Sequence, residues 1–364
     1  MEKTVLILGA RAPIALELCR SFAAKGYRVI CGDPYQFPAV RFSKNCNKYF
    51  RIPSPVFEFD GFRDAIKKIV NDEKVVHIIP TSEEAFHLSR IMNELPSKSW
   101  VSEIKLMDFL HNKHSFISFA KNFFMTPKTI LLSEFSDYDD EEKYVFKAIY
   151  SRFGQNIIFG EKKRYLSNSI IEKHKWIAQE KISGISVCTY SVFDEGKLKS
   201  LISYKPEFLY KGGASMLFEN YHNELIYNSV KKFGESINYT GQLSFDFIIA
   251  EDMPYVIECN PRGTSGAHLF DKYLAECFIS DIELSQNIVN INKALKFAIL
   301  LEYPLAFLDK KYRKSKDVIF KLSDPLPFFG QFLSISEIFY LKFTKRISMA
   351  EVMTYDIVFN GLEP

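Results

Sequence analysis

The sequence predicts a mixed α/β and α+β protein, in which a doubly wound N-terminal unit precedes a larger unit built on antiparallel hairpins. Residues 4–9 form a short, branched apolar run that ends in glycine, residues 14–25 follow with helical spacing, and residues 27–31 are apolar again. Residues 241–262 carry two further apolar runs, separated by the turn-forming segment 251–254. The first pattern is typical of a βαβ unit and the second of a hairpin.

A further strand over residues 75–79 supports a doubly wound sheet in the first hundred residues. It stops at a polar turn, where Thr81 or Ser82 could cap a helix over residues 83–94. The C-terminal part of the chain also contains helical spacing, over residues 290–301.

Two charged residues of the N-terminal unit lie where open α/β sheets bind their ligands, beyond the carboxyl ends of the strands. They are Arg11, after the first strand, and Glu83, after the strand over residues 75–79. We therefore expect both to contact a substrate; a structural role is the alternative for each. The loop over residues 9–14 keeps only the first glycine of a dinucleotide fingerprint and has Pro13 in the turn, which argues against nicotinamide binding.

Composition limits the class of protein. A length of 364 residues favours two or three packed units, and 47% hydrophobic with 25% charged residues indicates a globular chain. The net charge of +3 is too small to suggest a nucleic-acid partner, and no apolar run is long enough to span a membrane. The six cysteines lack a Cys-x-x-Cys pair and lie mostly in apolar runs, so we expect reduced thiols and a cytoplasmic location.

The hairpin over residues 241–262 carries the chemistry. Asp246 lies within its first apolar run, and Glu258, Asn260 and Arg262 follow the second. Carboxylates among aromatic and branched side chains are costly unless they are paired. Oxygen ligands of this kind suit Mg²⁺, which completes its shell with waters and substrate phosphates. The alternative is a surface hairpin whose carboxylates are solvated.

This hairpin resembles the last nucleotide-binding hairpin of the ATP-grasp superfamily, which ends in Glu-x-Asn-x-Arg after an upstream acidic ligand. The resemblance implies a Rossmann-like domain over residues 1–108, an ATP-grasp domain over residues 109–290 with a smaller nucleotide-clamping subdomain over about 126–184, and a C-terminal extension over residues 291–364. It also implies ATP and Mg²⁺ as cofactors, with Mn²⁺ as a possible substitute, and Asp246, Glu258 and Asn260 as metal ligands.

The resemblance extends to other nucleotide-binding positions. Two lysines match those that contact phosphates, an arginine lies in the phosphate loop, and four residues match the hinge strand that binds adenine. These residues are Lys113, Lys147, Arg152, Gln179, Glu180, Lys181 and Ile182. The chain departs from the family where the phosphate loop has the single glycine Gly154, and where Ser186 replaces the frequent ribose-binding glutamate.

Other residues match positions near the transferred phosphate and the acceptor. The resemblance implies Arg262, Lys205 and His268 as catalytic residues; for His268, a packing role is the alternative. The residues expected to contact substrate, besides Arg11 and Glu83, are Lys211, Gly213, Gly263, Thr264 and Ser265.

The implied activity is that of an ADP-forming carboxylate–amine or carboxylate–thiol ligase, which activates a small carboxylic or amino acid as an acyl phosphate. The relevant branch contains carbamoyl phosphate synthase, biotin carboxylase and amino-acid ligases. Two alternatives stay open: a bicarbonate-dependent enzyme that forms carboxyphosphate, and a non-catalytic ATP-binding scaffold. The aromatic C-terminal segments favour a homodimer, although the sequence leaves the oligomer undetermined.

Overall fold

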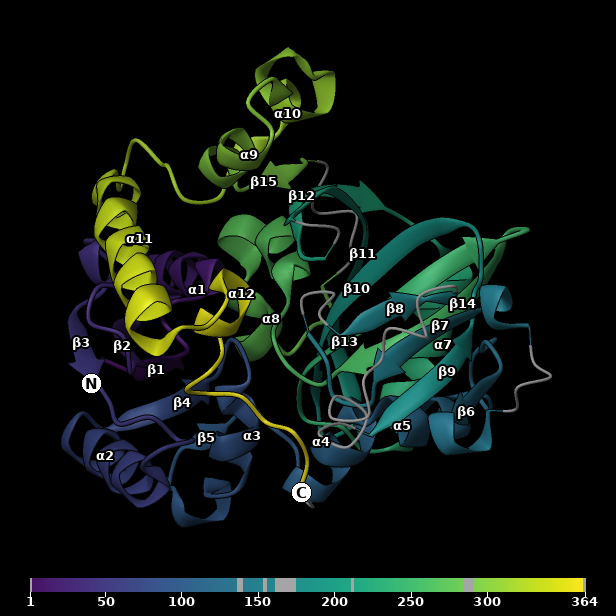
Figure 1. Cartoon of the computed structure of the whole chain (residues 1–364). Helices are drawn as coiled ribbons and strands as arrows, with labels where there is room; N and C mark the ends of the chain where they lie inside the picture. The colour runs from purple at the N-terminus through teal and green to yellow at the C-terminus, as the bar shows by residue number, and fades with distance from the viewer. Residues whose placement is uncertain are drawn as a thin grey trace.

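The computed structural model describes residues 2–135, 140–152, 156–160, 175–210, 213–284 and 291–362 (Figure 1). It contains a parallel sheet at the N-terminus, two further sheets that are antiparallel except for the pairing of β15 (Lys293–Ala294) with β16 (Lys316–Asp317), and a helical C-terminal part. The predicted mixed α/β and α+β class is confirmed.

The N-terminal sheet has five strands in the order β3-β2-β1-β4-β5, and every neighbouring pair is parallel. The strands are β1 (Thr4–Leu8), β2 (Arg28–Asp33), β3 (Lys48–Arg51), β4 (Val75–Ile79) and β5 (Lys98–Ser99). The helices of this unit are α1 (Pro13–Ala24), α2 (Phe59–Asp72), α3 (Glu84–Ser89) and α4 (Ile104–His111). Strands β1, β2 and β4 are almost wholly apolar because helices cover both faces of the sheet.

The side-chain cap predicted at Thr81 or Ser82 for the helix after β4 is wrong. Neither Thr81 nor Ser82 caps α3 with its side chain. Instead, Oε1 of Glu84 accepts hydrogen bonds from the backbone amides of both residues, at 2.6 and 2.9 Å. The helix also ends earlier than predicted, at Ser89, and a separate 3₁₀ turn (Met92–Glu94) follows it.

A small antiparallel sheet of four strands follows helix α5 (Lys113–Ala120). Its order is β6-β9-β7-β8. The strands are β6 (Thr129–Leu131), β7 (Tyr144–Ala148), β8 (Ile157–Phe159) and β9 (Trp176–Glu180). Asn112 begins α5 by accepting hydrogen bonds from the amides of His114 and Ser115, which fixes the orientation of the helix next to the sheet.

The largest sheet has seven strands in the order β14-β13-β10-β11-β12-β15-β16. They are β10 (Ile185–Asp194), β11 (Lys197–Leu209), β12 (Ser215–Tyr221), β13 (Gly241–Ala250), β14 (Met253–Asn260), β15 (Lys293–Ala294) and β16 (Lys316–Asp317). The hairpin predicted over residues 241–262 corresponds to β13 with β14, and β10 with β11 forms another. Glu251 and Asp252 have φ of 49° and 62°, the conformation that tight hairpin turns require.

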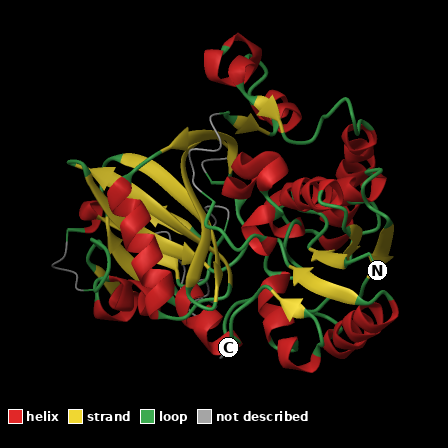
Figure 2. Ribbon diagram, turned by 180° about the vertical axis from the view of Figure 1, so that it is seen from behind, coloured by secondary structure: helices red, strands yellow, loops and turns green. Residues whose placement is uncertain are grey.

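One face of this sheet is closed by α5 and α7 (Glu224–Ser236), as Figure 2 shows from behind. The side chains between them are rich in phenylalanine, and Phe233 contacts Phe245 at a centroid separation of 5.4 Å. Because side chains alternate along a strand, burying Phe245 and Phe247 on this side directs Asp246 to the other face. That other face meets the small sheet and the N-terminal unit.

The C-terminal part is helical and differs from the prediction. The segment expected to be helical over residues 290–301 contains the short strand β15, and a helix starts only at Lys296. The helices after the site are α8 (Glu276–Ile279), α9 (Lys296–Glu302), α10 (Lys310–Lys314), α11 (Leu326–Lys345) and α12 (Met349–Val352). None of the described helices is both long and apolar enough to cross a membrane.

Candidate active site

A cleft of about 330 Å³ lies between the small sheet and the open face of the large sheet. Lys147 and Ile157 reach it from the small sheet, and the large sheet supplies its acidic wall. The predicted site residues that line it are Lys147, Arg152, Ser186, Gly213, Asp246, Glu258, Asn260, Arg262, Thr264 and Ser265. The structure therefore brings together ten positions that are up to 118 residues apart in sequence.

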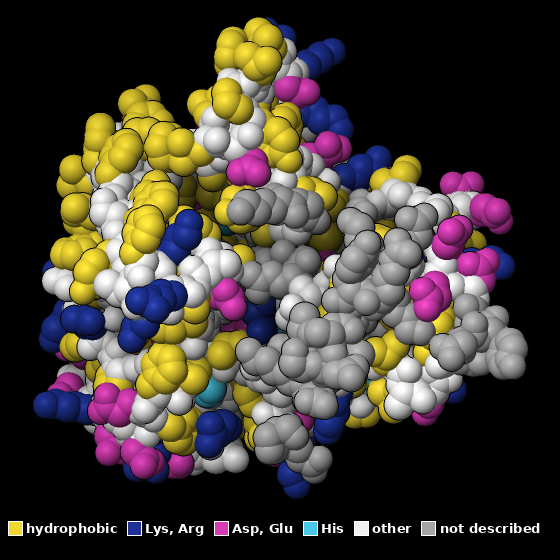
Figure 3. Space-filling model, viewed as in Figure 1, with side chains coloured by type: hydrophobic (Ala, Val, Ile, Leu, Met, Phe, Trp, Pro, Cys, Tyr) yellow, Lys and Arg dark blue, Asp and Glu magenta, His cyan; other side chains and the backbone are white. Residues whose placement is uncertain are grey.

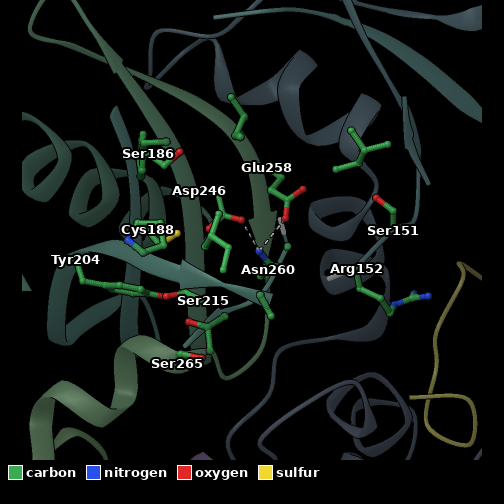
Figure 4. Close-up of a pocket in the computed structure, with 18 of the residues that line it drawn as sticks. Ser151, Arg152, Ser186, Cys188, Tyr204, Ser215, Asp246, Glu258, Asn260 and Ser265 are labelled. Atoms are coloured by element: carbon green, nitrogen blue, oxygen red, sulfur yellow. Dashed lines mark hydrogen bonds between the residues drawn. The ribbon is translucent and has the colours of Figure 1, made fainter. Parts of the chain in front are cut away.

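Four side chains form one row across neighbouring strands of the acidic wall. Glu258 on β14 is the cross-strand partner of Asp246 on β13, which pairs with Cys188 on β10, which pairs with Tyr204 on β11. Residues directly opposite each other on a sheet have their side chains about 5 Å apart. The row therefore presents two carboxylates, a thiol and a phenol side by side (Figure 4).

A β-bulge interrupts the pairing immediately next to this row. Asp246 pairs with Glu258, but Phe247 pairs with Val256, so Ile257 is an extra residue on β14. A bulge twists its strand and redirects side chains. Here it allows both Ile257 and Glu258 to line the cleft, although they are consecutive in sequence.

The two carboxylates are electrostatically unlike each other. Burial, the charge of Glu258 and a hydrogen bond with it raise the pKa of Asp246 to about 7. The pKa of Glu258 is lowered to about 2, because the charges of Lys113 and Lys147 outweigh the effect of burial. The pair therefore holds a proton more tightly than two solvated carboxylates would, and it favours a cation that can replace that proton.

Two buried lysines face the carboxylates. The Nζ atom of Lys113 lies 3.3 Å from Oε2 of Glu258 and also donates to the carbonyl of Ser151 at 3.3 Å. Lys147 donates to Oε1 of Gln179 at 2.8 Å. Burial lowers the pKa of Lys147 to about 8, although the nearby Glu258 raises it in part. Buried ammonium groups next to carboxylates can neutralise the oxygens of a polyanion such as a nucleotide phosphate.

Asn260 and Arg262 extend the acidic pair into a connected network. The amide of Asn260 donates toward Glu258 at 3.3 Å and toward Asp246 at 3.5 Å, and Figure 4 shows the three side chains pointing at one another. Arg262 donates to Oδ1 of Asn260 at 3.1 Å, while its buried Nε atom has no hydrogen-bond partner among the described residues. An unpaired guanidinium NH at the edge of a cleft is suited to bind an anion.

The donor set fits Mg²⁺ better than a metal that is fully enclosed by protein. Within the described ranges, no three His, Cys, Asp or Glu side chains gather in a way that could hold a metal ion. Two carboxylates suit a magnesium site when waters and phosphates provide the other ligands. Asn260, whose Oδ1 accepts from Arg262, would join them with its amide turned to present the oxygen. Burial and the neighbouring charge of Glu258 raise the pKa of Asp246, so a bound cation would favour the state in which both carboxylates are charged.

The predicted adenine-binding hinge lies at the end of β9. Gln179 is buried and donates to Oγ1 of Thr129 at 3.2 Å and to the carbonyl of Ile257 at 3.3 Å, so it joins both sheets. Glu180 and Lys181 are exposed, and their backbone amides donate to the carbonyls of Lys128 and Lys143. Ile182 is half-buried. These four residues are not among those that line the described cleft.

The opposite end of the cleft is formed by small and hydroxyl-bearing residues. Gly213, Ser215, Thr264 and Ser265 lie there. Gly263 packs so closely on the N-terminal unit that a β-carbon would lie 2.8 Å from the carbonyl of Thr81. This packing positions the following residues, Thr264 and Ser265, in the cleft. Lys211 lies outside the described residues.

Arg11 and Glu83 do not line the cleft, although the sequence suggested substrate contact. Arg11 forms buried ion pairs with Asp33 and Asp356 at 2.7 and 2.5 Å, and its guanidinium lies over the ring of Tyr35. Glu83 is 1% exposed. Both residues attach the N-terminal unit to other parts of the chain.

Arg152 lines the cleft but directs its donors elsewhere. It pairs with Glu83, and its Nη2 donates to the carbonyl of Phe359 at 2.9 Å and to Oδ1 of Asn360 at 3.1 Å. Figure 4 shows its side chain pointing away from Asp246 and Glu258. Arg152 thus joins the small sheet to the N-terminal unit and the C-terminal segment.

Lys205 and His268 lie apart from the cleft. Tyr204 and Pro206 line it, so alternation along β11 places Lys205 on the opposite face. There it is the cross-strand partner of Glu219, and its ammonium lies over the ring of Tyr221. His268 is 2% exposed, stacks on Phe218 and lies 3.6 Å from Glu17. This geometry fits the packing role for His268 and not the catalytic one.

Among the cleft residues that were not predicted from the sequence, those with polar side chains are Ser151, Cys188, Tyr204 and Ser215. The alternation of the strand over residues 187–193 could have placed Cys188 on the face opposite to the buried Val187. Placing it beside Asp246 needs the register of two strands that are more than fifty residues apart. Burial raises the pKa of the Cys188 thiol well above its usual range, and the charge of Asp246 adds to this.

Comparison with known proteins agrees with this geometry. A family model described as an ATP-grasp domain matches residues 110–266. A search of curated proteins found no match.

Solved structures with the same fold include three that cover most of the chain. N5-carboxyaminoimidazole synthetase from Staphylococcus aureus, complexed with ADP, is 15% identical with a TM-score of 0.62, covering 87% of this chain and 91% of its own. The biotin carboxylase domain of Hydrogenobacter thermophilus 2-oxoglutarate carboxylase, in complex with MgADP, ADP and bicarbonate, is 15% identical (TM-score 0.60, covering 80% and 72%). L-amino acid ligase from Bacillus licheniformis is 13% identical (TM-score 0.55, covering 75% and 69%).

Proposed function

We propose that this chain, which belongs to the ATP-grasp superfamily, is an ADP-forming ligase. It would activate a small carboxylic or amino acid with ATP and join the activated acid to an amine or a thiol. One observation carries the proposal: the acidic pair Asp246 and Glu258 shares one cleft with the buried cation Lys147, and a second buried cation, Lys113, lies 3.3 Å from Glu258. A phosphoryl-transfer site needs this combination, because its catalysis consists mainly of positioning and charge neutralisation.

Asp246, Glu258 and Asn260 would hold Mg²⁺. The adenine edge would meet the backbone at Ile182, the hinge residue next to the amides of Glu180 and Lys181 that already donate within the protein. When bound, Mg²⁺-ATP supplies the phosphoryl group that converts the carboxylate into an acyl phosphate with release of ADP. Lys147 and Lys113 would neutralise phosphate oxygens. Arg262, whose Nε is unpaired among the described residues, would hold the transferring phosphoryl group and stabilise negative charge as it develops.

The acceptor end of the cleft supports a small substrate. Ser215, Thr264 and Ser265 offer hydroxyl groups, and Gly213 allows close approach of the backbone. Tyr204 and Cys188 lie between this end and the metal ligands. The cleft therefore offers hydrogen-bonding groups within a modest volume of about 330 Å³.

The test is phosphate release from Mg²⁺-ATP by the purified protein, with a panel of amino acids and carboxylic acids supplied together with ammonia, amine and thiol acceptors. We expect release that depends on one acid and one acceptor and is lost in Glu258→Gln. ATP binding without release in any mixture would favour the non-catalytic alternative.

Bicarbonate belongs in the same panel as a separate arm. Two of the structures with the same fold carry bicarbonate or a carboxyamino product in their names, so a carboxyphosphate-forming enzyme is the second candidate. Release that depends on bicarbonate alone, and on no organic acid, would favour it over the proposed ligase.

A further inference from the structure

Helix α11 has an unusual distribution of side chains, because its solvent-facing stripe is apolar. The exposed residues recur with helical spacing and include Phe329, Phe332, Leu333, Phe339, Tyr340 and Phe343. Tyr340 is 67% exposed and Phe343 is 72% exposed. A helix packed on a globular domain normally presents polar residues to water. We call these six residues the aromatic stripe.

The opposite side of α11 packs on the N-terminal unit, so the aromatic stripe is not the side by which the helix attaches to the rest of the protein. Gly330 lies against the ring of Phe42. Ser334 donates to the carbonyl of Phe37, and Glu337 accepts from the amides of Gln36 and Phe37 at 2.8 Å each. The inward side is therefore fixed by polar contacts, and the stripe points outward.

The apolar surface continues onto the neighbouring C-terminal elements. Leu301, Leu305, Phe307 and Leu308, in and after α9, are each more than half exposed. Figure 3 shows hydrophobic side chains gathered along α11 and again at the projecting tip formed by α9 and α10. An exposed apolar region of this extent marks a binding surface.

The charge of the same segment identifies what it binds. Residues 296–346 contain ten Lys or Arg and five Asp or Glu, whereas the whole chain has a net charge of only +3. The remainder of the protein therefore has a net charge of −2. Three of the five acids are engaged internally: Asp324 pairs with Arg20, Glu337 holds two amides and Asp309 caps α10. Two of the ten bases are engaged as well, Lys311 with Glu207 and Glu219, and Lys321 with Glu17 and Asp271. The exposed bases include Arg313 and Lys314 on α10, and Lys345 and Arg346 at the end of α11.

We propose that the aromatic stripe and the exposed bases of residues 296–346 bind the surface of an anionic lipid bilayer. Aromatic side chains would enter the headgroup boundary, while Lys and Arg would contact anionic headgroups. The binding would be peripheral. A second copy of the chain is the weaker occupant, because face-to-face pairing would bring two positively charged segments together, whereas an anionic bilayer complements them.

Vesicle co-sedimentation of the full chain tests this proposal without reference to catalysis. The probes are phosphatidylcholine vesicles and vesicles of phosphatidylcholine with about one third phosphatidylglycerol. We expect binding to the anionic vesicles that weakens with added salt and is at least tenfold weaker to the neutral ones. The variant Phe339→Ser/Phe343→Ser should lose at least tenfold in binding, and Lys345→Ser/Arg346→Ser should lose severalfold.

The matched control is Phe57→Ser, which removes a phenylalanine that is 66% exposed on the N-terminal unit and should leave binding unchanged. ADP affinity, measured on every variant, reports whether the fold is intact. Absence of binding to either vesicle, or equal loss in Phe57→Ser, would overturn the proposal. So would a dimer in sedimentation equilibrium without lipid that Phe339→Ser/Phe343→Ser converts to a monomer, because a second copy would then cover the stripe.

Discussion

Asp246 and Glu258 are direct cross-strand partners on β13 and β14, and the amide of Asn260 lies within 3.5 Å of both carboxylates. Two carboxylates this close cannot both be charged at low cost without a cation. The site is therefore arranged for function at the expense of stability, and this has measurable consequences.

We predict that Asp246→Asn stabilises the nucleotide-free protein. The raised pKa of Asp246 means that the native state holds a proton more tightly than the unfolded state, so the wild type loses stability as the pH rises from about 4 to about 7. Asp246→Asn has no ionisable group at this position, so it does not lose stability in this way. Its gain in the free energy of unfolding should be on the order of 1–2 kcal/mol at pH 8 and smaller at pH 5. Denaturant unfolding at the two pH values checks this, and a variant less stable than the wild type at pH 8 would contradict it.

Nucleotide affinity should depend on the charge of Lys147. With its pKa lowered to about 8, the ammonium is charged below that pH and loses its proton above it. The Kd of Mg²⁺-ADP should therefore rise above pH 8, by up to about tenfold per pH unit. In Lys147→Met, the Kd should be at least about tenfold higher at pH 7 and should show little of this rise. Calorimetric titrations from pH 7 to 9.5 measure it; a wild-type Kd constant over that range would refute the role given to Lys147.

The ion pair between Arg152 and Glu83 should stabilise the attachment of the small sheet to the rest of the protein. Arg152→Ala would leave the buried Glu83 without its partner and should cost about 3–5 kcal/mol. Adding Glu83→Gln removes the uncompensated charge and should recover part of the loss. A double-mutant cycle by chemical denaturation measures the coupling. Additive effects of the two substitutions would show that the pair contributes nothing.

Acid should destabilise the protein through His111. Burial lowers the pKa of this histidine well below its usual range, and the charges of Arg152 and Lys113 contribute. The unfolded state takes up a proton near pH 6.5 and the native state does not, so stability is lost as the pH falls below about 6.5. His111→Phe should flatten the decrease between pH 7 and 5, whereas His222→Phe, at an exposed position, should not. Equal slopes in all three proteins would contradict this assignment.

The hairpin was predictable because its information is local. Apolar runs, a turn and acidic residues within about twenty positions predict the hairpin and its candidate metal ligands, and the structure places Asp246, Glu258, Asn260 and Arg262 in one network. The bulge at Ile257 was not predictable, since it depends on how β13 and β14 pair residue by residue. Cys188 and Tyr204 were missed for the same reason.

Long-range ion pairs account for the residues that the sequence placed differently. Arg11 was expected to contact substrate because it follows β1, yet its partner Asp356 lies 345 positions away in sequence. No local pattern reveals such a partner. Lys205 is different, because strand alternation alone could have placed it on the face opposite to Tyr204.

The most direct measurement is the affinity for ADP with and without Mg²⁺, in the wild type and in Glu258→Gln, by isothermal titration. The charges of Lys113 and Lys147 lower the pKa of Glu258, so Glu258, unlike Asp246, is ionised before a cation binds. We therefore expect Glu258 to be the more important ligand for Mg²⁺. We predict that Mg²⁺ tightens ADP binding at least tenfold in the wild type and has little effect in the variant, which should remain folded. Equal tightening in both proteins would show that Asp246 and Glu258 do not form the metal site.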